Sequence, residues 1–276
     1  MPYVTVGQEN SGAIRIYYED HGQGAPVVLV HGFLLNGRSW EKQEAALLAA
    51  GYRVVTYDRR GFGGSSRPSV GYDYDTLAAD LGVLMGRLDL RGAVLAGFCA
   101  GTGEVLRYLG VPGRGRVRAA ALIAPLAPGV PWAGDDQGRG VLGEFIGQLS
   151  ADRPAAIKTF LDRSYNIDLL GGTRVSDQAW QNSFHVAIGA SAAAVRGCAA
   201  AWLEDFRADL ARITVPVLVV QGAQDRIAPP RAAGSPLPGL PVSPRHVVVP
   251  GGPHAIIWTH ADEVNQALLA FIRGPG

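Results

Sequence analysis

Short apolar runs alternate with longer helical patterns along most of this chain. Five runs rich in β-branched residues are bounded by turn-forming residues: Val27–Val30, Val54–Tyr57, Val94–Ala96, Val217–Val220 and Val247–Val249. Such runs are typical of strands in a parallel sheet that helices cover on both faces, because neither face meets water. Apolar residues recur at helical spacing between them, over residues 40–49, 76–88 and 261–272. Strands and helices in alternation predict an α/β layer fold.

Three regions depart from this alternation. Residues 3–6 and 13–19 alternate apolar and polar side chains, which predicts an antiparallel hairpin. Between about Pro125 and Ala211 the strand-like runs vanish, and helices are predicted over residues 141–149, 155–161, 177–188 and 192–206, with Ser176-Asp177 capping the third. We interpret residues 125–210 as a helical cap inserted into an α/β core of residues 1–124 and 211–276; a separate domain is the alternative, although no linker-like tract flanks the region. Six prolines in residues 229–244 predict a loop, because interior prolines break helices.

Composition narrows the classes of partner. Lys and Arg number 25 against 24 Asp and Glu, so a net charge of +1 gives no electrostatic reason to expect nucleic acid or an anionic membrane. The chain shows no secretory signal and no apolar run near the ~20 residues of a membrane span, so we expect a soluble, cytoplasmic protein. Two cysteines, Cys99 and Cys198, allow neither a disulfide framework nor a clustered zinc site. No metal or cofactor is therefore expected.

The sequence Gly97-Phe98-Cys99-Ala100-Gly101 follows the predicted strand Val94–Ala96 and precedes a helical run. A G-x-nucleophile-x-G pattern at such a turn forces its central residue into a strained conformation and presents that side chain at the carboxyl edge of the sheet. The N-terminus of the following helix would stabilise a thiolate there. This segment alone leaves a nucleophile and a buried structural cysteine equally open.

Two further residues follow strands in the same way. Asp225 comes just after the strand Val217–Val220, and His254 comes after the strand Val247–Val249. Singly, Asp225 is explained as a turn residue and His254 as a surface histidine. Together with Cys99 they have the chain order nucleophile, acid, histidine, which is the order of the α/β-hydrolase triad. We therefore predict that Cys99, Asp225 and His254 are catalytic.

A second loop at this edge predicts the oxyanion hole. The strand ending at Val30 runs into His31-Gly32-Phe33, so the backbone N–H of Phe33 could pair with that of Ala100 to stabilise a tetrahedral intermediate. We expect His31 to be structural rather than a second base. The segment from Asp58 to Ser66 lacks phosphate-loop spacing and is predicted to be a turn braced by Asp58 and the arginines.

With these residues in place, the chain resembles the α/β-hydrolase superfamily, and within it the cofactor-free (non-haem) haloperoxidase and esterase branch. The resemblance extends from Tyr3 to Ile272 and rests on residues 7–10, 17–20, 31–33, 57–66, 71–75, 97–104 and 258–265. It implies an eight-stranded, mostly parallel sheet with helices on both faces, a helical cap, and the roles given above for Cys99, Asp225, His254, Phe33 and Ala100. Residues 125–200 match least, and the proline-rich tract replaces a helix that the family usually has.

Position 99 departs from the branch, whose members carry serine there and usually methionine next. Peroxide would oxidise a reactive Cys99, so a peroxidase activity is not expected. A thioacyl-enzyme forms best from an activated donor and is prone to attack by amines. We therefore expect acyl transfer, cyclisation or hydrolysis of an activated ester or thioester, such as a carrier-bound small-molecule acyl group in a biosynthetic pathway.

Three other functions stay open: a carboxylester or lactone hydrolase, as in dienelactone hydrolases, which also have a G-x-C-x-G elbow; a haloperoxidase-like perhydrolase; and a non-catalytic ligand-binding protein. Cys198 is expected in the core, with a redox pair to Cys99 as the alternative. Trp132, Trp180 and Trp258 are expected in the core or a pocket wall. The sequence leaves open whether identical subunits assemble.

Overall fold

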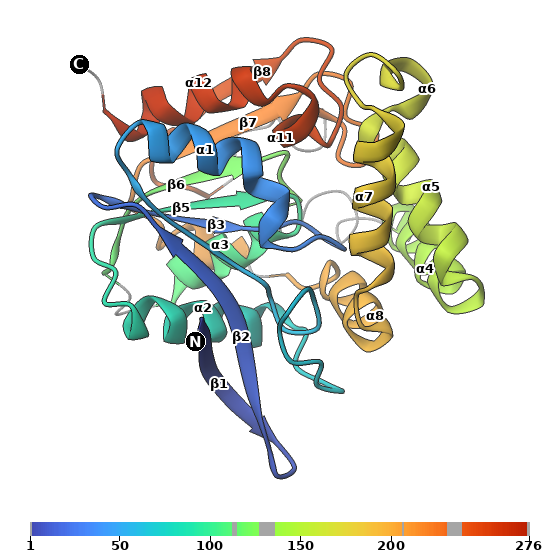
Figure 1. Ribbon diagram of the computed structural model, residues 1–276, viewed down its shortest axis with the longest axis horizontal. Coiled ribbons are helices and arrows are strands. Elements are labelled where there is room, and N and C mark those ends of the chain that lie inside the picture. Colours follow the sequence, from blue (N-terminus) through green and yellow to red (C-terminus); the bar gives the residue numbers. More distant parts are fainter. Residues whose placement is uncertain (1, 112–114, 127–135, 206, 231–238, 275–276) are drawn as a thin grey trace.

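The computed structural model of this chain describes residues 2–111, 115–126, 136–205, 207–230 and 239–274. Its strands form one eight-stranded sheet in the order β1-β2-β4-β3-β5-β6-β7-β8 (Figure 1). The strands are β1 (Tyr3–Glu9), β2 (Gly12–His21), β3 (Pro26–Val30), β4 (Arg53–Tyr57), β5 (Ala93–Phe98), β6 (Val117–Ile123), β7 (Val217–Gly222) and β8 (Arg245–Val249). The predicted hairpin β1–β2 is antiparallel, β2 pairs with β4 antiparallel, and all later neighbours are parallel. The predicted α/β-hydrolase architecture of the sheet is confirmed.

Helices cover both faces of the sheet. The described helices are η1 (Gly37–Trp40), α1 (Glu41–Ala49), α2 (Tyr74–Arg87), α3 (Gly101–Gly110), α4 (Asp136–Ala151), α5 (Arg153–Tyr165), α6 (Ile167–Leu170), α7 (Asp177–Ile188), α8 (Ala192–Ala201), α9 (Arg207–Leu210), α11 (Ile256–Thr259) and α12 (Ala261–Ile272). Helices α1, α11 and α12 pack together on one face, and α2, α3 and α9 pack on the other (Figure 1). The central strands β5 and β7 are therefore buried along their whole length, as their apolar runs predict.

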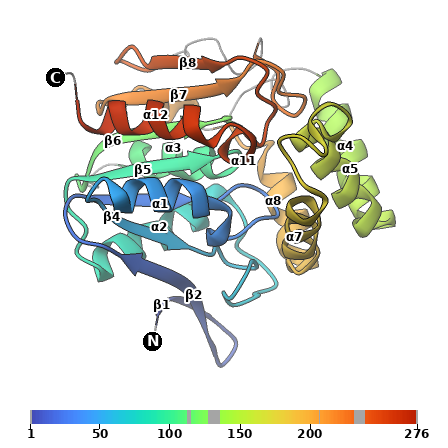
Figure 2. The same cartoon turned by 45° about the horizontal axis from the view of Figure 1, so that its top comes forward.

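The register of the parallel strands brings their carboxyl ends to one edge. Val30 of β3 lies opposite Gly97 of β5, and Ile123 of β6 lies opposite Val220 of β7. Helices α4 to α8 lie beyond this edge, where α5 contacts both α4 and α7 (Figure 2). Loops that leave the strands here face these helices, which is the arrangement in which open α/β sheets bind ligands.

The structure departs from the sequence predictions in several elements. β6 was not predicted, because its sequence VRAAALI is rich in alanine and lacks β-branched residues at most positions. The helix predicted over residues 192–206 ends at Ala201. β8 is not covered on both faces: Val248 is 58% exposed because β8 is an edge strand of the sheet.

Other predictions concern a helix cap, the short helices and the proline-rich tract. Ser176 caps α7 by accepting the N–H of Ala179, as predicted. The short helices α6, α9 and α11 have too few residues to show a periodic pattern. Pro230 is helical and residues 239–244 are turn and coil, while residues 231–238 of the predicted loop, and Trp132, lie outside the described residues.

No single described helix is long and apolar enough to cross a membrane. The helices α7 and α8 meet that criterion of length and composition only when they are taken together, as a pair bent by 94°.

Candidate active site

Cys99 occupies a sharp turn between strand β5 and helix α3. Its φ of 53° lies in the left-handed region that residues other than glycine rarely adopt. The turn brings backbone segments so close that a Cβ at Gly97 would lie 2.7 Å from the Gly101 carbonyl oxygen, and one at Gly101 would overlap the Val30 carbonyl oxygen. Both glycines of the G-x-C-x-G pattern are therefore required by close approach. A residue held in a strained backbone conformation, as Cys99 is here, is typical of functional sites.

Asp225 follows β7 and is held by four donors. Its Oδ1 accepts the backbone N–H groups of Ile227 at 2.8 Å and Ala228 at 2.7 Å. Its Oδ2 accepts the Gln221 amide at 3.0 Å and approaches His254 Nδ1 at 2.7 Å. An ionised carboxylate only accepts hydrogen bonds, so this set of donors fits the charged form and fixes its orientation.

His254 follows β8 and connects Asp225 to Cys99. Its Nδ1 donates to Asp225, and its Nε2 has no hydrogen-bond partner of ordinary geometry among the described residues. Burial by itself lowers the pKa of His254, but the charges of Asp225 and Cys99 and the hydrogen bond to Asp225 raise this pKa to about 10. The imidazole is therefore charged at neutral pH when Cys99 is a thiolate. The structure thus brings together all three residues that the sequence singled out.

The two backbone donors expected for an oxyanion hole also lie at this edge. Phe33 and Ala100 are 2% and 1% exposed. Neither N–H donates to an acceptor among the described residues. Buried N–H groups are nearly always paired, so two unpaired ones beside Cys99 are free to bind an oxyanion.

Aromatic rings from the cap region enclose Phe33. Its ring centroid lies 6.2 Å from that of Phe145, 5.5 Å from Phe160 and 4.8 Å from Trp202. The same three rings line a pocket together with Leu142, Arg163 and Ile227. The three rings that line this pocket therefore also pack against the ring of Phe33. The sequence did not single out these residues, because Phe145, Phe160 and Trp202 come from separate elements with no common spacing.

His31 and Asp58, for which the sequence predicts structural roles, make hydrogen bonds that hold these loops. His31 Nε2 accepts the N–H of Arg59 at 3.0 Å, and burial lowers the pKa of His31 well below its usual value, so it is neutral. Asp58 accepts the N–H groups of Gly37 and Gly64, both at 2.8 Å, which braces the turn after β4.

Three residues that contact the site were missed at the level of sequence: Gln221, Arg59 and Thr102. Gln221 donates to Asp225, Arg59 donates to the Gly32 carbonyl, and Thr102 donates to the Cys99 carbonyl. A polar residue in an otherwise apolar strand, as in VLVVQG, is a signal that could have indicated Gln221. The contacts of Arg59 and Thr102 depend on tertiary structure alone.

Among the described residues, one group of possible metal ligands lies on elements that do not carry Cys99, Asp225 or His254. Glu19 and His21 of β2 and Glu44 of α1 hold their ligand atoms within 4.8 Å of one another. Cys198 is buried in α8, as expected, and both cysteines are free.

Comparison with known proteins agrees with this architecture. Residues 25–261 match a family model described as alpha/beta hydrolase fold. A "Putative non-heme chloroperoxidase" of Synechocystis sp. is 54% identical, over 99% of this chain and 100% of that protein. A "Bifunctional esterase/perhydrolase" of Acinetobacter calcoaceticus is 32% identical, over 99% and 100%. The crystal structure of a bromoperoxidase from Bacillus anthracis superposes with a TM-score of 0.90 at 37% identity, covering 98% of this chain and 99% of that one.

Proposed function

This chain belongs to the α/β-hydrolase fold family, in its non-haem haloperoxidase and esterase branch, and we propose that it cleaves activated esters, lactones or thioesters through a thioacyl-enzyme on Cys99. The observation that carries this proposal is the position of Cys99. It sits at positive φ in the turn before α3 and interacts with His254, whose other ring nitrogen is bonded to Asp225. A buried structural cysteine requires neither the strained backbone nor the charged partners.

The proposed reaction has two steps. The Cys99 thiolate attacks the carbonyl carbon, a C–S bond forms, and the electron pair of the C=O bond moves to the oxygen. The N–H groups of Phe33 and Ala100 would stabilise that oxyanion. As the bond to the alcohol or thiol breaks, the leaving group takes the proton from His254 Nε2. His254 then removes a proton from water, the resulting hydroxide attacks the thioester, and the C–S bond breaks to release the acid.

We also propose that residues 125–210 act as a cap that bears the acyl group of the substrate. The aromatic wall formed by Phe145, Phe160 and Trp202 supports this assignment, because it joins the pocket beside α4 and α5 to the ring of Phe33. Such a wall favours an apolar or aromatic acyl group.

Trapping of the acyl-enzyme tests the proposal. The purified protein would be mixed with a panel of p-nitrophenyl esters, lactones and acyl thioesters and examined by intact-mass and peptide mass spectrometry. We expect one acyl adduct on Cys99, no adduct and no turnover with Cys99→Ala, and a normal adduct with Cys198→Ala, the matched control at the other buried cysteine. Turnover that persists in Cys99→Ala would refute the proposal.

Acyl transfer, rather than hydrolysis, is a second candidate that the burial of the site favours. Cys99 and His254 are each 1% exposed, so little water reaches the thioacyl carbon until the site opens. Amines attack thioesters more readily than water does at equal concentration. Turnover of an acyl thioester substrate with and without added amines would distinguish transfer from hydrolysis. Transfer predicts that added amine yields an amide product at the expense of the free acid.

Perhydrolysis is a third candidate because a relative is named an esterase/perhydrolase and others chloroperoxidases. In that reaction hydrogen peroxide replaces water as the attacking group. A free thiolate in the same site would itself be oxidised to sulfenic and then sulfinic acid. Hydrogen peroxide is therefore expected to inactivate this protein, with a mass increase on Cys99 and slower inactivation when a saturating ester is present. Sustained peracid formation without oxidation of Cys99 would favour perhydrolysis.

A further inference from the structure

A buried arginine lies directly behind the proposed oxyanion hole. Arg59 follows β4 and is 1% exposed. Its Nη2 donates to the Gly32 carbonyl oxygen at 3.1 Å. Buried arginines are rare unless a partner compensates their charge, and this one makes its hydrogen bond to a backbone carbonyl instead of a carboxylate.

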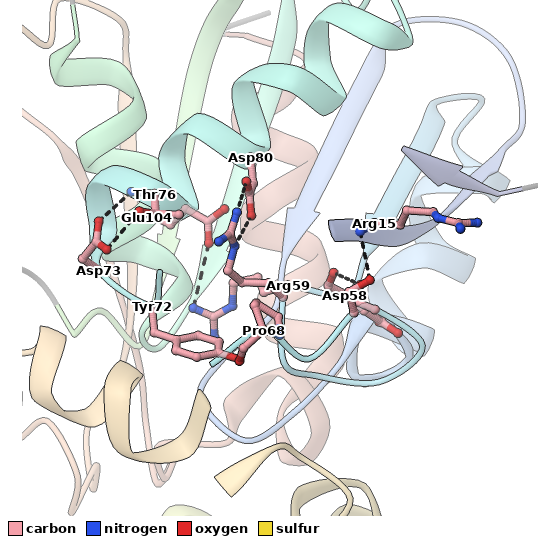
Figure 3. A network of polar contacts seen from close by, with 12 residues as sticks. Arg15, Asp58, Arg59, Pro68, Tyr72, Asp73, Thr76, Asp80 and Glu104 are labelled. Carbon is pink, nitrogen blue, oxygen red and sulfur yellow. Dashed lines mark hydrogen bonds and ion pairs between the residues drawn. The ribbon is translucent and has the colours of Figure 1, made fainter. Parts of the chain in front are cut away.

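The carboxylate nearest to Arg59 is Glu104, on α3, and the contact between them is loose. Arg59 Nη1 is 3.9 Å from Glu104 Oε2, which is beyond hydrogen-bond distance (Figure 3). Glu104 is fully buried and its other oxygen accepts the hydroxyl of Tyr57. Neither Glu104 Oε2 nor Arg59 Nε has a hydrogen-bond partner among the described residues. A charged pair that serves only to stabilise the fold is expected to close this gap, because the direct bond is the stronger one.

The Gly32 carbonyl belongs to the same peptide unit as the Phe33 N–H. This carbonyl accepts from three donors: Arg59 Nη2, the backbone N–H of Leu35 at 3.4 Å, and His31 Nδ1 at 2.8 Å. His31 Nδ1 must be the protonated nitrogen of the neutral ring, because Nε2 accepts the N–H of Arg59. Donors at the carbonyl end polarise a peptide and make its N–H a stronger donor. A guanidinium is the strongest of these three because it is charged.

The peptide that carries the Ala100 N–H, the second candidate donor of the oxyanion hole, is arranged in the same way, but all its hydrogen-bond donors are neutral. The Cys99 carbonyl shares a peptide unit with the Ala100 N–H. It accepts from Thr102 Oγ1 at 2.6 Å, Thr102 N at 3.0 Å and Leu126 N at 3.3 Å. Both peptides therefore have three donors on the carbonyl and an N–H without an acceptor among the described residues. Two independent loops sharing this pattern indicate that it serves the N–H groups and not only the fold of one turn.

We propose that Arg59 is a positioning residue for the oxyanion hole, whose guanidinium fixes and polarises the Gly32–Phe33 peptide so that the Phe33 N–H stabilises the charge on the reacting carbonyl. This inference rests on the proposed function. Arg59 touches no reacting atom and acts only through the peptide.

Two reactions of Cys99 separate this role from a structural one. Acylation by a p-nitrophenyl ester passes through an oxyanion, whereas alkylation by iodoacetamide displaces iodide at a saturated carbon and forms none. We expect Arg59→Met to slow single-turnover acylation about 10- to 100-fold, less than the ~100- to 1,000-fold for deleting a donor, and to change alkylation less than about twofold. Arg59→Lys keeps the charge and should recover part of the acylation rate.

The matched control is the neighbouring arginine. Arg60 is 6% exposed, and its guanidinium makes two hydrogen bonds of 2.7 Å to the carboxylate of Asp80. Arg60→Met is expected to lower stability without changing the ratio of acylation to alkylation. If Arg59→Met does not fold, Glu104→Gln tests the same idea with opposite sign. At about pH 8, above the pKa of about 7 to which burial raises Glu104, this substitution removes the counter-charge of Arg59, so the ratio of acylation to alkylation should rise.

The possible results are all decisive. If the acylation and alkylation rates of Cys99 fall together in Arg59→Met, Arg59 is structural. An unchanged ratio of these two rates in the folded variants would overturn the proposed role of Arg59 in the oxyanion hole. A fall or no change in Glu104→Gln would contradict the inference when Arg59→Met is lost. Failure of the unmodified protein to be acylated at all would instead refute the proposed function.

Discussion

The dependence of Cys99 on Asp225 is tested by the substitution Asp225→Asn. All four hydrogen bonds to this carboxylate come from donors, two at each oxygen. An amide NH₂ at the Oδ1 position would face two backbone N–H groups and be repelled. It therefore takes the Oδ2 position, where Gln221 can turn to offer its Oε1 atom, which has no hydrogen-bond partner. His254 Nδ1 must then accept a hydrogen bond, which places the ring proton on Nε2 and prevents it from taking a proton from Cys99.

The size of the effect follows from the charges at His254. Asp225 is the largest of the groups that raise the pKa of His254 to about 10, against the effect of burial. Without that charge the imidazolium is lost at neutral pH, and Cys99 should react as an ordinary thiol does. An ordinary thiol with a pKa near 8.5 is only ~3% ionised at pH 7. Alkylation of Cys99 at pH 7 should therefore slow about 30-fold or more.

The assay is the rate of iodoacetamide labelling of Cys99 as a function of pH, read by peptide mass spectrometry. We expect the unmodified protein to label rapidly well below pH 8.5, and Asp225→Asn to recover only as the pH approaches 9 to 10. Asp80→Asn is the control, since Asp80 is a carboxylate of the same 4% exposure outside the site. Equal labelling of the Asp225→Asn variant and the unmodified protein at pH 7 would refute the triad and revive a non-catalytic binding protein.

Three further predictions concern the nucleophile, the turn and the buried carboxyl group behind it. Cys99→Ser should abolish iodoacetamide labelling at position 99 and inactivation by peroxide. Ester hydrolysis should persist but be about 10- to 1,000-fold slower, because a hydroxyl depends on His254 as a full base. Hydrolysis measured before and after peroxide treatment checks this, and a variant that peroxide still inactivates would contradict it. Gly101→Ala should destabilise the folded protein by about 1–3 kcal/mol or disrupt the turn, since its Cβ meets the Val30 carbonyl. Gly86→Ala in α2 has open space around its Cβ and should stabilise the folded protein by about 0.4–1 kcal/mol. Urea unfolding of both variants tests the contrast, and equal shifts of the unfolding midpoint would refute it. Burial raises the pKa of Glu104 from 4.5 to about 7, so between these pH values the folded state holds more protons than the unfolded state. The free energy of unfolding should therefore fall by up to about 3 kcal/mol as the pH rises from about 4.5 to 7. This loss should be absent in Glu104→Gln, and an identical pH profile of stability in both proteins would contradict the assignment.

The sequence identified the residues at the carboxyl ends of the strands more reliably than the strands themselves. Cys99, Asp225 and His254 were located because each directly follows a short apolar run and because glycines surround them. β6 was not predicted although it lies in the middle of the sheet. β6 pairs through its backbone with β5 and β7 and its alanines are buried, but alanine has little intrinsic preference for strands, so burial decided what local propensity did not.

Contacts that depend on the fold left no pattern in the sequence. Phe145, Phe160 and Trp202 meet around Phe33 only because α4, α5 and the end of α8 converge beyond the sheet edge. Arg59 was expected to brace its own turn, whereas its guanidinium reaches the Gly32 carbonyl in the loop after β3. Both contacts join segments from different parts of the chain, and spacing along the chain carries no information about such pairs.

The similarity to haloperoxidases concerns the fold of this chain, whereas the sulfur at position 99 concerns the reaction that we propose for it. Identity of 54% over nearly the whole chain shows the family and its fold. The fold presents a nucleophile but does not determine which attacking group the acyl-enzyme meets. In the proposed mechanism that depends on one side chain: a thiolate beside a charged imidazole would react with peroxide itself, and its thioester would be more open to amines than an oxygen ester is. The proposed thiolate of Cys99 is therefore expected to prevent sustained peroxide chemistry at this site, whatever reaction the related proteins carry out.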